Sequence, residues 1–307
     1  MIIDFHTHIF PRKFRDDRTA LINRDATFRE MYTNPDSRMA TAERLIDRMD
    51  DDGVDVSVAM GIGWESFELA RICNDYILES VTKYPDRLIG FASVNPAWGD
   101  KAASEAERYA EAGLRGIGEL HPTMQGYDIS DHSIMLPLMD VVKSHELIVT
   151  THSSEPVGHD YPGKGTTYPE VLLRFIQNFP DQTIVCAHWG GGLPMHALMP
   201  ELKPQLTKTY FDTAASPLLY TPNVFPTMVS AAGVDHVLLG SDYPLVRVET
   251  LLKQVETAQL SQVDKDAING GNAARLLGWI YSGNLIMPRP SSRRSKALKA
   301  SFISSKG

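Results

Sequence analysis

The hydrophobic positions of this chain follow two alternating patterns along its length. Short apolar runs rich in β-branched residues are typical of buried strands, and longer segments with apolar residues at helical spacing are typical of amphipathic helices. The predicted strands are 1–8, 54–60, 88–94, 114–120, 147–151, 183–187, 210–213 and 237–240. The predicted helices are 41–52, 65–84, 101–112, 132–145, 168–179, 222–232, 246–258 and 262–277, with another after a glycine turn at 190–192.

Eight strands alternating with helices predict an α/β fold of the (β/α)8 TIM-barrel type, with a doubly wound open sheet as the alternative. Stop signals support the helix boundaries, since Gly53 follows one predicted helix and Pro85 follows the next. The segment 10–38 follows neither pattern and has no predicted elements. A long insertion after the first strand of a barrel is a natural place for contacts to a substrate.

The first predicted strand ends in two histidines, His6 and His8, separated by one residue. Because side chains alternate between the faces of a strand, both imidazoles point the same way and Thr7 points back. Neutral histidine nitrogens aimed at one point suit a metal ion such as zinc. A chance histidine pair near a terminus is the alternative, since so short a motif produces many false matches.

Four further polar residues lie at or just past the ends of later predicted strands: Glu119, His152, His188 and Asp242. The carboxyl ends of barrel strands meet at one face, and catalytic residues lie there. Each residue alone could be a hydrogen-bonded loop residue. Together they form a coherent set of imidazole and carboxylate ligands for zinc, manganese or iron.

Composition narrows the class of protein further. With 43% hydrophobic and 22% charged residues in 307, the chain matches an ordinary soluble protein with one large core. A net charge of -8 argues against a general affinity for nucleic acid or anionic membrane. Cys73 and Cys186 are too few for a disulfide framework, and a buried reduced thiol at Cys186 indicates a cytoplasmic protein. No apolar stretch approaches the length of a membrane span.

The last part of the chain differs in composition from the rest. Residues 287–307 contain no acidic residue, and the basic residues there are Arg289, Arg293, Arg294, Lys296, Lys299 and Lys306. This composition predicts a solvated disordered tail, with a binding role as the alternative. We therefore expect a single barrel domain over 1–286.

A glycine-rich segment at 158–166 nearly matches a phosphate-binding P-loop. However, Gly165 occupies the position after the lysine where Ser or Thr must hold magnesium, so a nucleotide-binding loop is not expected. We predict instead that 153–167 is a loop that shapes the pocket after the fifth strand. His159 and Lys164 are candidates to bind an anionic group of the substrate, and a solvated polar loop is the alternative.

Several motifs at once resemble the amidohydrolase superfamily, in particular the branch that includes aminocarboxymuconate-semialdehyde decarboxylase. They are Ile3-Asp4-Phe5-His6-Thr7-His8, Ala187-His188-Trp189-Gly190-Gly191, Leu239-Gly240-Ser241-Asp242-Tyr243-Pro244 and Gly271-Asn272-Ala273-Ala274-Arg275-Leu276-Leu277-Gly278. The resemblance covers residues 1–278 and implies a distorted (β/α)8 barrel with a divalent metal at its mouth. It implies that the ligands are His6 and His8 on the first strand, His152 on the fifth, His188 on the sixth and Asp242 on the eighth.

One position departs from the decarboxylase pattern. The fourth strand ends in Glu119, where many superfamily members have a carboxylated lysine that bridges two metals. A glutamate there is similar to TatD-type nucleases, which implies a bridging ligand. The alternative is that Glu119 accepts hydrogen bonds from a ligand histidine or orients the substrate.

These features predict a metal-dependent enzyme. A metal held by neutral imidazoles lowers the pKa of bound water from about 15.7 to about 7. We expect a hydrolase of a C–O or C–N bond in a small carboxylated molecule, with a metal-bound hydroxide as the attacking group. Asp242 would be the general base. His188 would complete a second metal site or polarise the scissile carbonyl.

Zinc is the expected cofactor, as one ion or two, with Mn²⁺ and Fe²⁺ as alternatives. The expected partner is a small-molecule substrate, and a homo-oligomer is compatible with the sequence. The alternative function is a non-oxidative decarboxylase or hydratase on the same site. A binding protein without activity ranks last, because it has no need for Asp242 beside the histidines.

Overall fold

Eight parallel strands form one sheet whose spatial order is the order of the chain. The computed structural model describes residues 1–282 and 285–288. The strands are β1 (Ile3–His8), β2 (Val56–Met60), β3 (Leu88–Ala92), β4 (Gly116–Leu120), β5 (Ile148–Thr151), β6 (Ile184–Cys186), β7 (Thr209–Asp212) and β8 (Val237–Leu238). All eight predicted strands are confirmed, with ends shifted by a few residues.

The sheet closes into a barrel because β1 also bonds to the chain that follows β8. Phe5 donates its amide to the Leu239 carbonyl at 2.7 Å, and His8 donates to the Tyr243 carbonyl at 2.7 Å. A buried carboxylate reinforces this seam, since Asp4 accepts hydrogen bonds from the amide and hydroxyl of Ser241 at 2.8 and 2.5 Å. The predicted (β/α)8 barrel is therefore confirmed.

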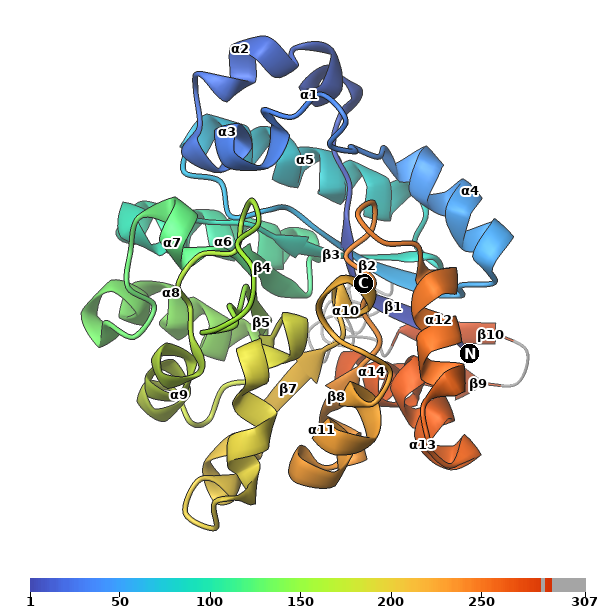
Figure 1. The fold of residues 1–307 in the computed structure, drawn as a ribbon. Helices are drawn as coiled ribbons and strands as arrows, with labels where there is room; N and C mark the ends of the chain where they lie inside the picture. The colour runs from blue at the N-terminus through green and yellow to red at the C-terminus, as the bar shows by residue number, and fades with distance from the viewer. Residues whose placement is uncertain (283–284, 289–307) are drawn as a thin grey trace, which may run out of the picture.

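Helices surround the strands (Figure 1). The longer ones are α4 (Ala42–Asp52), α5 (Phe67–Lys83), α6 (Asp100–Ala112), α8 (His132–His145), α9 (Pro169–Asn178), α11 (Val224–Ala232) and α12 (Val248–Thr257). The shorter ones are α7 (Pro122–Gln125), α10 (Ser216–Leu219), α13 (Gln262–Asp266) and α14 (Asn272–Leu277). Local sequence fixes their ends: the Thr41 hydroxyl caps α4 at the amide of Arg44, and Gly53 ends it with a φ of 72°.

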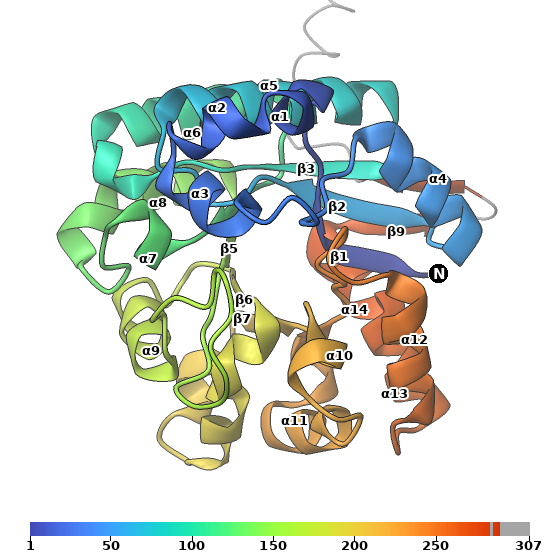
Figure 2. The same ribbon diagram turned by 45° about the horizontal axis from the view of Figure 1, so that its top comes forward.

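Apolar residues form two buried clusters. The larger one joins the inner faces of the helices to strand residues such as Ala59 and Ile117. The smaller one joins strand residues such as Phe5 and Phe91 to α14 through Leu277. Figure 2 shows α5 and α6 lying along the outer side of the sheet near β3, where they cover the strands from solvent.

The segment without predicted elements folds as three short helices, α1 (Arg12–Asp16), α2 (Arg18–Ile22) and α3 (Ala26–Tyr32), grouped beside α5 in Figure 1. Its aromatic residues pack around one indole. The Trp64 ring lies 5.8 Å from Phe14, 5.9 Å from Phe28 and 6.1 Å from Phe10, measured between centroids. Burial of these aromatic rings stabilises the three helices, although the sequence of the insertion shows no clear helical repeat.

Two predicted helices differ from the structure. The helix after the glycine turn is a 3-10 segment, η2 (His188–Leu198), in which Trp189 and the three following glycines have positive φ. These left-handed residues and Pro194 prevent a regular α-helix there. The predicted helix 262–277 is divided by a π-helical turn, η5 (Ala267–Gly271), between α13 and α14.

After α14 the chain forms two antiparallel strands, β9 (Trp279–Ser282) and β10 (Leu285–Pro288). The predicted domain boundary between 286 and 287 falls inside β10, and 289–307 of the predicted tail lie outside the described residues. Within the described residues we find no helix with the length and hydropathy of a membrane span.

Candidate metal centre

The two histidines of β1 share one buried site. His6 and His8 are 0% and 4% exposed, and their Nε2 atoms lie 3.1 Å apart. The intervening Thr7 points elsewhere and donates its hydroxyl to the Val58 carbonyl at 2.7 Å. The predicted alternation of side chains along the strand is confirmed.

Glu119, at the end of β4, lies between two pairs of histidines. Its Oε2 is 3.6 Å from His6 Nε2 and 3.7 Å from His8 Nε2. Its Oε1 is 3.2 Å from His152 Nδ1 and 3.6 Å from His188 Nε2. Each carboxylate oxygen therefore faces a different pair of imidazoles.

Asp242 completes the cluster from the turn after β8. Its Oδ1 lies 3.2 Å from His8 Nε2 and 4.0 Å from His6 Nε2. Its side chain is 15% exposed, compared with 5% for Glu119, so it is the cluster carboxylate nearest solvent. Asp242 has a φ of 65° and His188 a φ of 52°, a left-handed conformation that is costly for residues other than glycine and is frequent at functional sites. The structure thus brings together all six residues predicted as ligands.

Each histidine ring is fixed through the nitrogen that does not face the cluster. His6 Nδ1 donates to Asp212 at 2.8 Å, His8 Nδ1 to the Met60 carbonyl at 3.2 Å and His188 Nδ1 to the Ala214 carbonyl at 3.1 Å. His152 is reversed, since its Nε2 donates to the Lys164 carbonyl at 3.0 Å. The other ring nitrogens, three Nε2 and one Nδ1, face inward, where they can bind a cation in place of a proton.

The carboxylates of the cluster favour their charged forms. Burial alone would raise the pKa of Glu119, but the charge of His6 and hydrogen bonds from the surrounding histidines hold it well below its usual range. Burial likewise opposes the ionisation of Asp242, and the hydrogen bond from His8 outweighs it and lowers the pKa. Burial disfavours the charged form of His188, but Glu119 and Asp242 raise its pKa to about 9. Such a site attracts positive charge.

Asp212, at the end of β7, is a residue that the sequence analysis missed. It is fully buried, its Oδ2 accepts from His6, and its Oδ1 accepts the amides of His188 and Ala214 at 3.1 and 3.0 Å. It therefore positions ligands from β1 and β6 together. The available signal was a carboxylate at the end of the predicted strand 210–213, the same signal that identified Glu119.

His121, just after β4, is a second missed residue. Its ring stacks on His152 with centroids 4.1 Å apart and an angle of 8° between the planes. Its Nε2 donates to the Gly163 carbonyl at 2.8 Å, and Nδ1 has no hydrogen-bond partner within the described part of the chain. Burial and the nearby charge of His152 lower the pKa of His121 to about 3. It therefore stays neutral and can support His152 without repelling a cation.

The two residues predicted to bind substrate lie apart from this cluster. Lys164 Nζ donates to the carbonyls of His159 and Val157 at 3.0 and 3.4 Å and lies 3.7 Å from Asp160. The His159 side chain is exposed. Lys164 reaches the cluster only through its backbone carbonyl, which bonds to His152. Anion binding by His159 and Lys164 therefore stays a prediction.

The donor set suits a divalent metal. Two groups of three buried ligands share Glu119: one with His6 and His8, the other with His152 and His188. Within each group the ligand atoms lie within 4.8 Å of one another. Imidazole and carboxylate donors without thiolate suit divalent zinc, manganese and iron.

We expect Asp212→Asn to weaken divalent metal binding by roughly 10–100-fold, the usual effect of losing a carboxylate that orients a ligand histidine. The side-chain amide has one acceptor oxygen in place of two, so it cannot accept hydrogen bonds from His6 and also from the backbone amides of His188 and Ala214. Chelator competition measures the affinity, with exposed Asp235→Asn as the control. An affinity equal to wild type would show that Asp212 does not position the ligands.

A closed barrel with histidines and carboxylates gathered at the carboxyl ends of its strands defines the class of metal-dependent barrel enzymes. This chain belongs to the amidohydrolase family, which it matches over residues 3–279.

The three curated proteins that match this chain are decarboxylases. The 2-amino-3-carboxymuconate-6-semialdehyde decarboxylase of Dictyostelium discoideum is 24% identical over 90% of this chain and 91% of its own length. The structure of 5-carboxyvanillate decarboxylase from Sphingomonas paucimobilis superposes with a TM-score of 0.71 at 20% identity, covering 90% of this chain and 98% of its own. A dihydroxybenzoic acid decarboxylase from Polaromonas, solved with manganese and 2-nitroresorcinol, has a TM-score of 0.67 at 19% identity, covering 90% and 96%.

These comparisons correct the predicted hydrolase activity, because the curated relatives that match are decarboxylases. The prediction was wrong because Glu119 and a complete ligand set identify a cation site without identifying which bond is broken there. The expectation of a divalent metal is confirmed, and manganese, named as an alternative to zinc, is the ion bound in the Polaromonas structure.

Proposed function

We propose that this protein is a metal-dependent, non-oxidative decarboxylase of a small aromatic carboxylate. The observation that carries the proposal is the similarity to a decarboxylase over 90% of the chain. The buried cluster at the mouth of the barrel supports it, because it supplies ligands for a cation that can bind a carboxylate. The substrate class follows from related decarboxylases, one of which was solved with 2,6-dihydroxybenzoate.

The residues divide into two ligand sets around Glu119. His6, His8, Asp242 and Oε2 of Glu119 would hold one ion, and His152, His188 and Oε1 of Glu119 would hold a second. When bound, divalent cations supply positive charge that fixes substrate oxygens and offsets negative charge developing on them. We favour manganese, the ion found in the Polaromonas relative.

Asp242 is the residue we assign to proton transfer. In this reaction the ring carbon that bears the carboxylate gains a proton, its bond to the carboxylate breaks, and the electron pair of that bond returns to the ring as carbon dioxide leaves. One proton is taken up and no oxidant is needed. Asp242 is suited to relay that proton, because its ionised carboxylate contacts His8 and is the cluster carboxylate most open to solvent, so that it can first take up a proton and then pass it to the ring. His188 is suited to be a ligand with a fixed orientation, since its Nδ1 is held by the Ala214 carbonyl and its Nε2 faces the cluster.

Turnover in deuterium oxide tests the proposal directly. The manganese-loaded protein is incubated with 2,6-dihydroxybenzoate and with 5-carboxyvanillate, and carbon dioxide and the aromatic product are measured by mass spectrometry. We expect one carbon dioxide per product and one deuterium at the carbon that lost the carboxylate. Chelator-treated protein is the control.

Failure to release carbon dioxide from either acid would count against the proposed substrate class. Cleavage of an ester or amide analogue without carbon dioxide release would contradict decarboxylation itself.

A further inference from the structure

Glu155, in the loop after β5, is a buried carboxylate outside the metal cluster. It is 9% exposed. Tyr161 donates its hydroxyl to Glu155 Oε2 at 2.9 Å, and Tyr220, from the end of α10, donates to Oε1 at 3.4 Å. Within residues 1–282 and 285–288, no lysine, arginine or histidine forms an ion pair with Glu155. The side-chain groups that donate hydrogen bonds to this carboxylate are therefore two neutral phenols.

The backbone segment that leads to Glu155 lies beside two segments that carry metal ligands. Only Ser153 and Ser154 separate it from His152, and the Ser154 hydroxyl bonds to the same Lys164 carbonyl that accepts from His152. On the other side, the turn after His188 passes so close that a side chain at Gly191 would overlap the Ser154 carbonyl. Glu155 is thus fixed between segments that carry ligands from β5 and β6.

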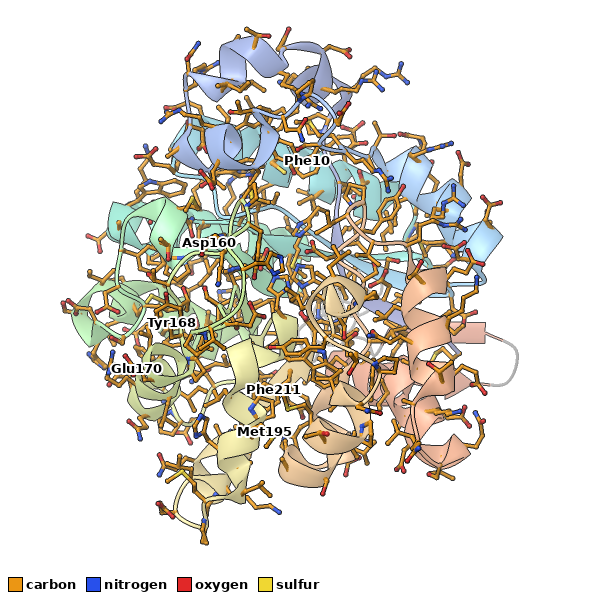
Figure 3. The ribbon with its side chains drawn as sticks, in the orientation of Figure 1. Phe10, Asp160, Tyr168, Glu170, Met195 and Phe211 are labelled. Carbon is orange, nitrogen blue, oxygen red and sulfur yellow. The ribbon has the colours of Figure 1, made fainter. Side chains whose placement is uncertain are left out.

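The phenol of Tyr161 is half-buried and is influenced by negative charge on neighbouring carboxylates. Burial raises its pKa above the usual value, and negative charge from Glu155 and from Asp242 adds to this increase. The hydroxyl therefore remains protonated and donates to Glu155. The loop that carries Tyr161 also carries Asp160, which Figure 3 shows between Phe10 of the insertion and Glu170 of α9.

Glu155 retains unused capacity to accept hydrogen bonds. An ionised carboxylate has about four acceptor positions, and the two phenols occupy two of them. Burying this charge without a cation is costly, and further donors reduce the cost. A hydrogen bond from a ligand to a charged group is worth roughly 1.5–3 kcal/mol, which corresponds to about 10–100-fold in affinity.

We propose that Glu155, with Tyr161 and Tyr220, forms a substrate subsite that selects a hydrogen-bond donor, a hydroxyl or amino group, on a carboxylate substrate. The inference rests on the proposed function, in which the substrate carboxylate binds at the metal cluster. The negative charge of Glu155 disfavours a second carboxylate at this position. The preferred ligand is a hydroxylated or aminated monocarboxylate, and its methyl ether is rejected because it has no proton to donate.

Calorimetry with matched ligands tests this subsite without turnover. The manganese-loaded protein is titrated with 3-hydroxybenzoate, 4-hydroxybenzoate and the two corresponding methoxybenzoates. We expect at least one hydroxy acid to bind wild type roughly tenfold or more tightly than its methyl ether. Glu155→Gln is expected to reduce this ratio to about threefold or less, and the exposed Glu170→Gln, on the neighbouring helix, is expected to keep it.

Tyr161→Phe separates recognition from a structural role. It keeps the Glu155 charge and frees one acceptor position, so the preference for the hydroxy acid should persist. If Glu155 only joins two loops, Glu155→Gln will weaken binding of both members of a pair equally and leave the ratio unchanged. An unchanged ratio, equal affinities in wild type, or no binding of any of the four acids would each overturn the subsite.

The outcome is distinguishable from failure of the proposed function. A ratio that depends on Glu155, together with no carbon dioxide release, would support the subsite and reject the decarboxylase. Carbon dioxide release, together with an affinity ratio that does not depend on Glu155, would support the decarboxylase and reject the subsite. Metal content and the melting temperature of Glu155→Gln verify that the variant is folded and loaded.

Discussion

Replacing Asp242 by asparagine is expected to lower kcat for decarboxylation by at least ~10²-fold while leaving most of the bound metal in place. An amide oxygen can still face His8, as the Asp242 carboxylate does at 3.2 Å, but the amide cannot carry a proton at neutral pH. Because the defect lies in proton transfer, KM should change much less than kcat.

Steady-state kinetics and elemental analysis of the same preparations separate the two effects. Asp160→Asn is the matched control, since Asp160 is exposed on a nearby loop and should leave kcat unchanged. Near-normal turnover by Asp242→Asn, with metal retained, would assign Asp242 a structural role and leave the proton donor to be sought elsewhere in the cluster.

The second large effect concerns Glu119. We expect wild type to bind two divalent ions per chain and Glu119→Gln to bind about one, because a bridging carboxylate offsets the repulsion between two cations. The geometry supports a bridge, since Oε2 faces His6 and His8 while Oε1 faces His152 and His188. Glutamine has one acceptor oxygen and no charge, so it can serve only one of the two pairs.

Elemental analysis of purified, manganese-loaded protein gives the stoichiometry without a substrate. Glu170→Gln is a control for the same chemical change on the surface. One ion per chain in both wild type and Glu119→Gln would show that Glu119 is not a bridge. In that case Glu119 would orient ligand histidines, and the variant should bind its single ion roughly 10–100-fold more weakly.

Local patterns in the sequence were sufficient to predict the barrel. Apolar runs of strand length alternate with helical repeats, and signals such as Thr41 and Gly53 set the helix ends close to where the structure has them. The direction of His6 and His8 was also predictable, because side-chain alternation along a strand is a local property. The same holds for residues that follow a strand directly, such as His152 and Asp242.

Other features depended on contacts between distant parts of the chain. The helices of the insertion at 10–38 are stabilised by packing on Trp64, which no local repeat indicates. Asp212 becomes a partner of His6 only when the closed barrel brings together residues separated by 206 positions. The hydrogen bond from Tyr220 to Glu155 also depends on the fold, because Tyr220 lies 65 residues further along the chain.

The amino-acid sequence was enough to predict which side chains stand at the carboxyl ends of the strands, because strand periodicity and turn residues act over a few neighbouring positions. It did not determine which atoms of those side chains face one another. That depended on closure of the barrel, which places one oxygen of Glu119 toward β1 and the other toward His152 and His188. This arrangement of the two oxygens required the folded barrel, because distances between side chains on different strands are fixed by packing of the whole sheet.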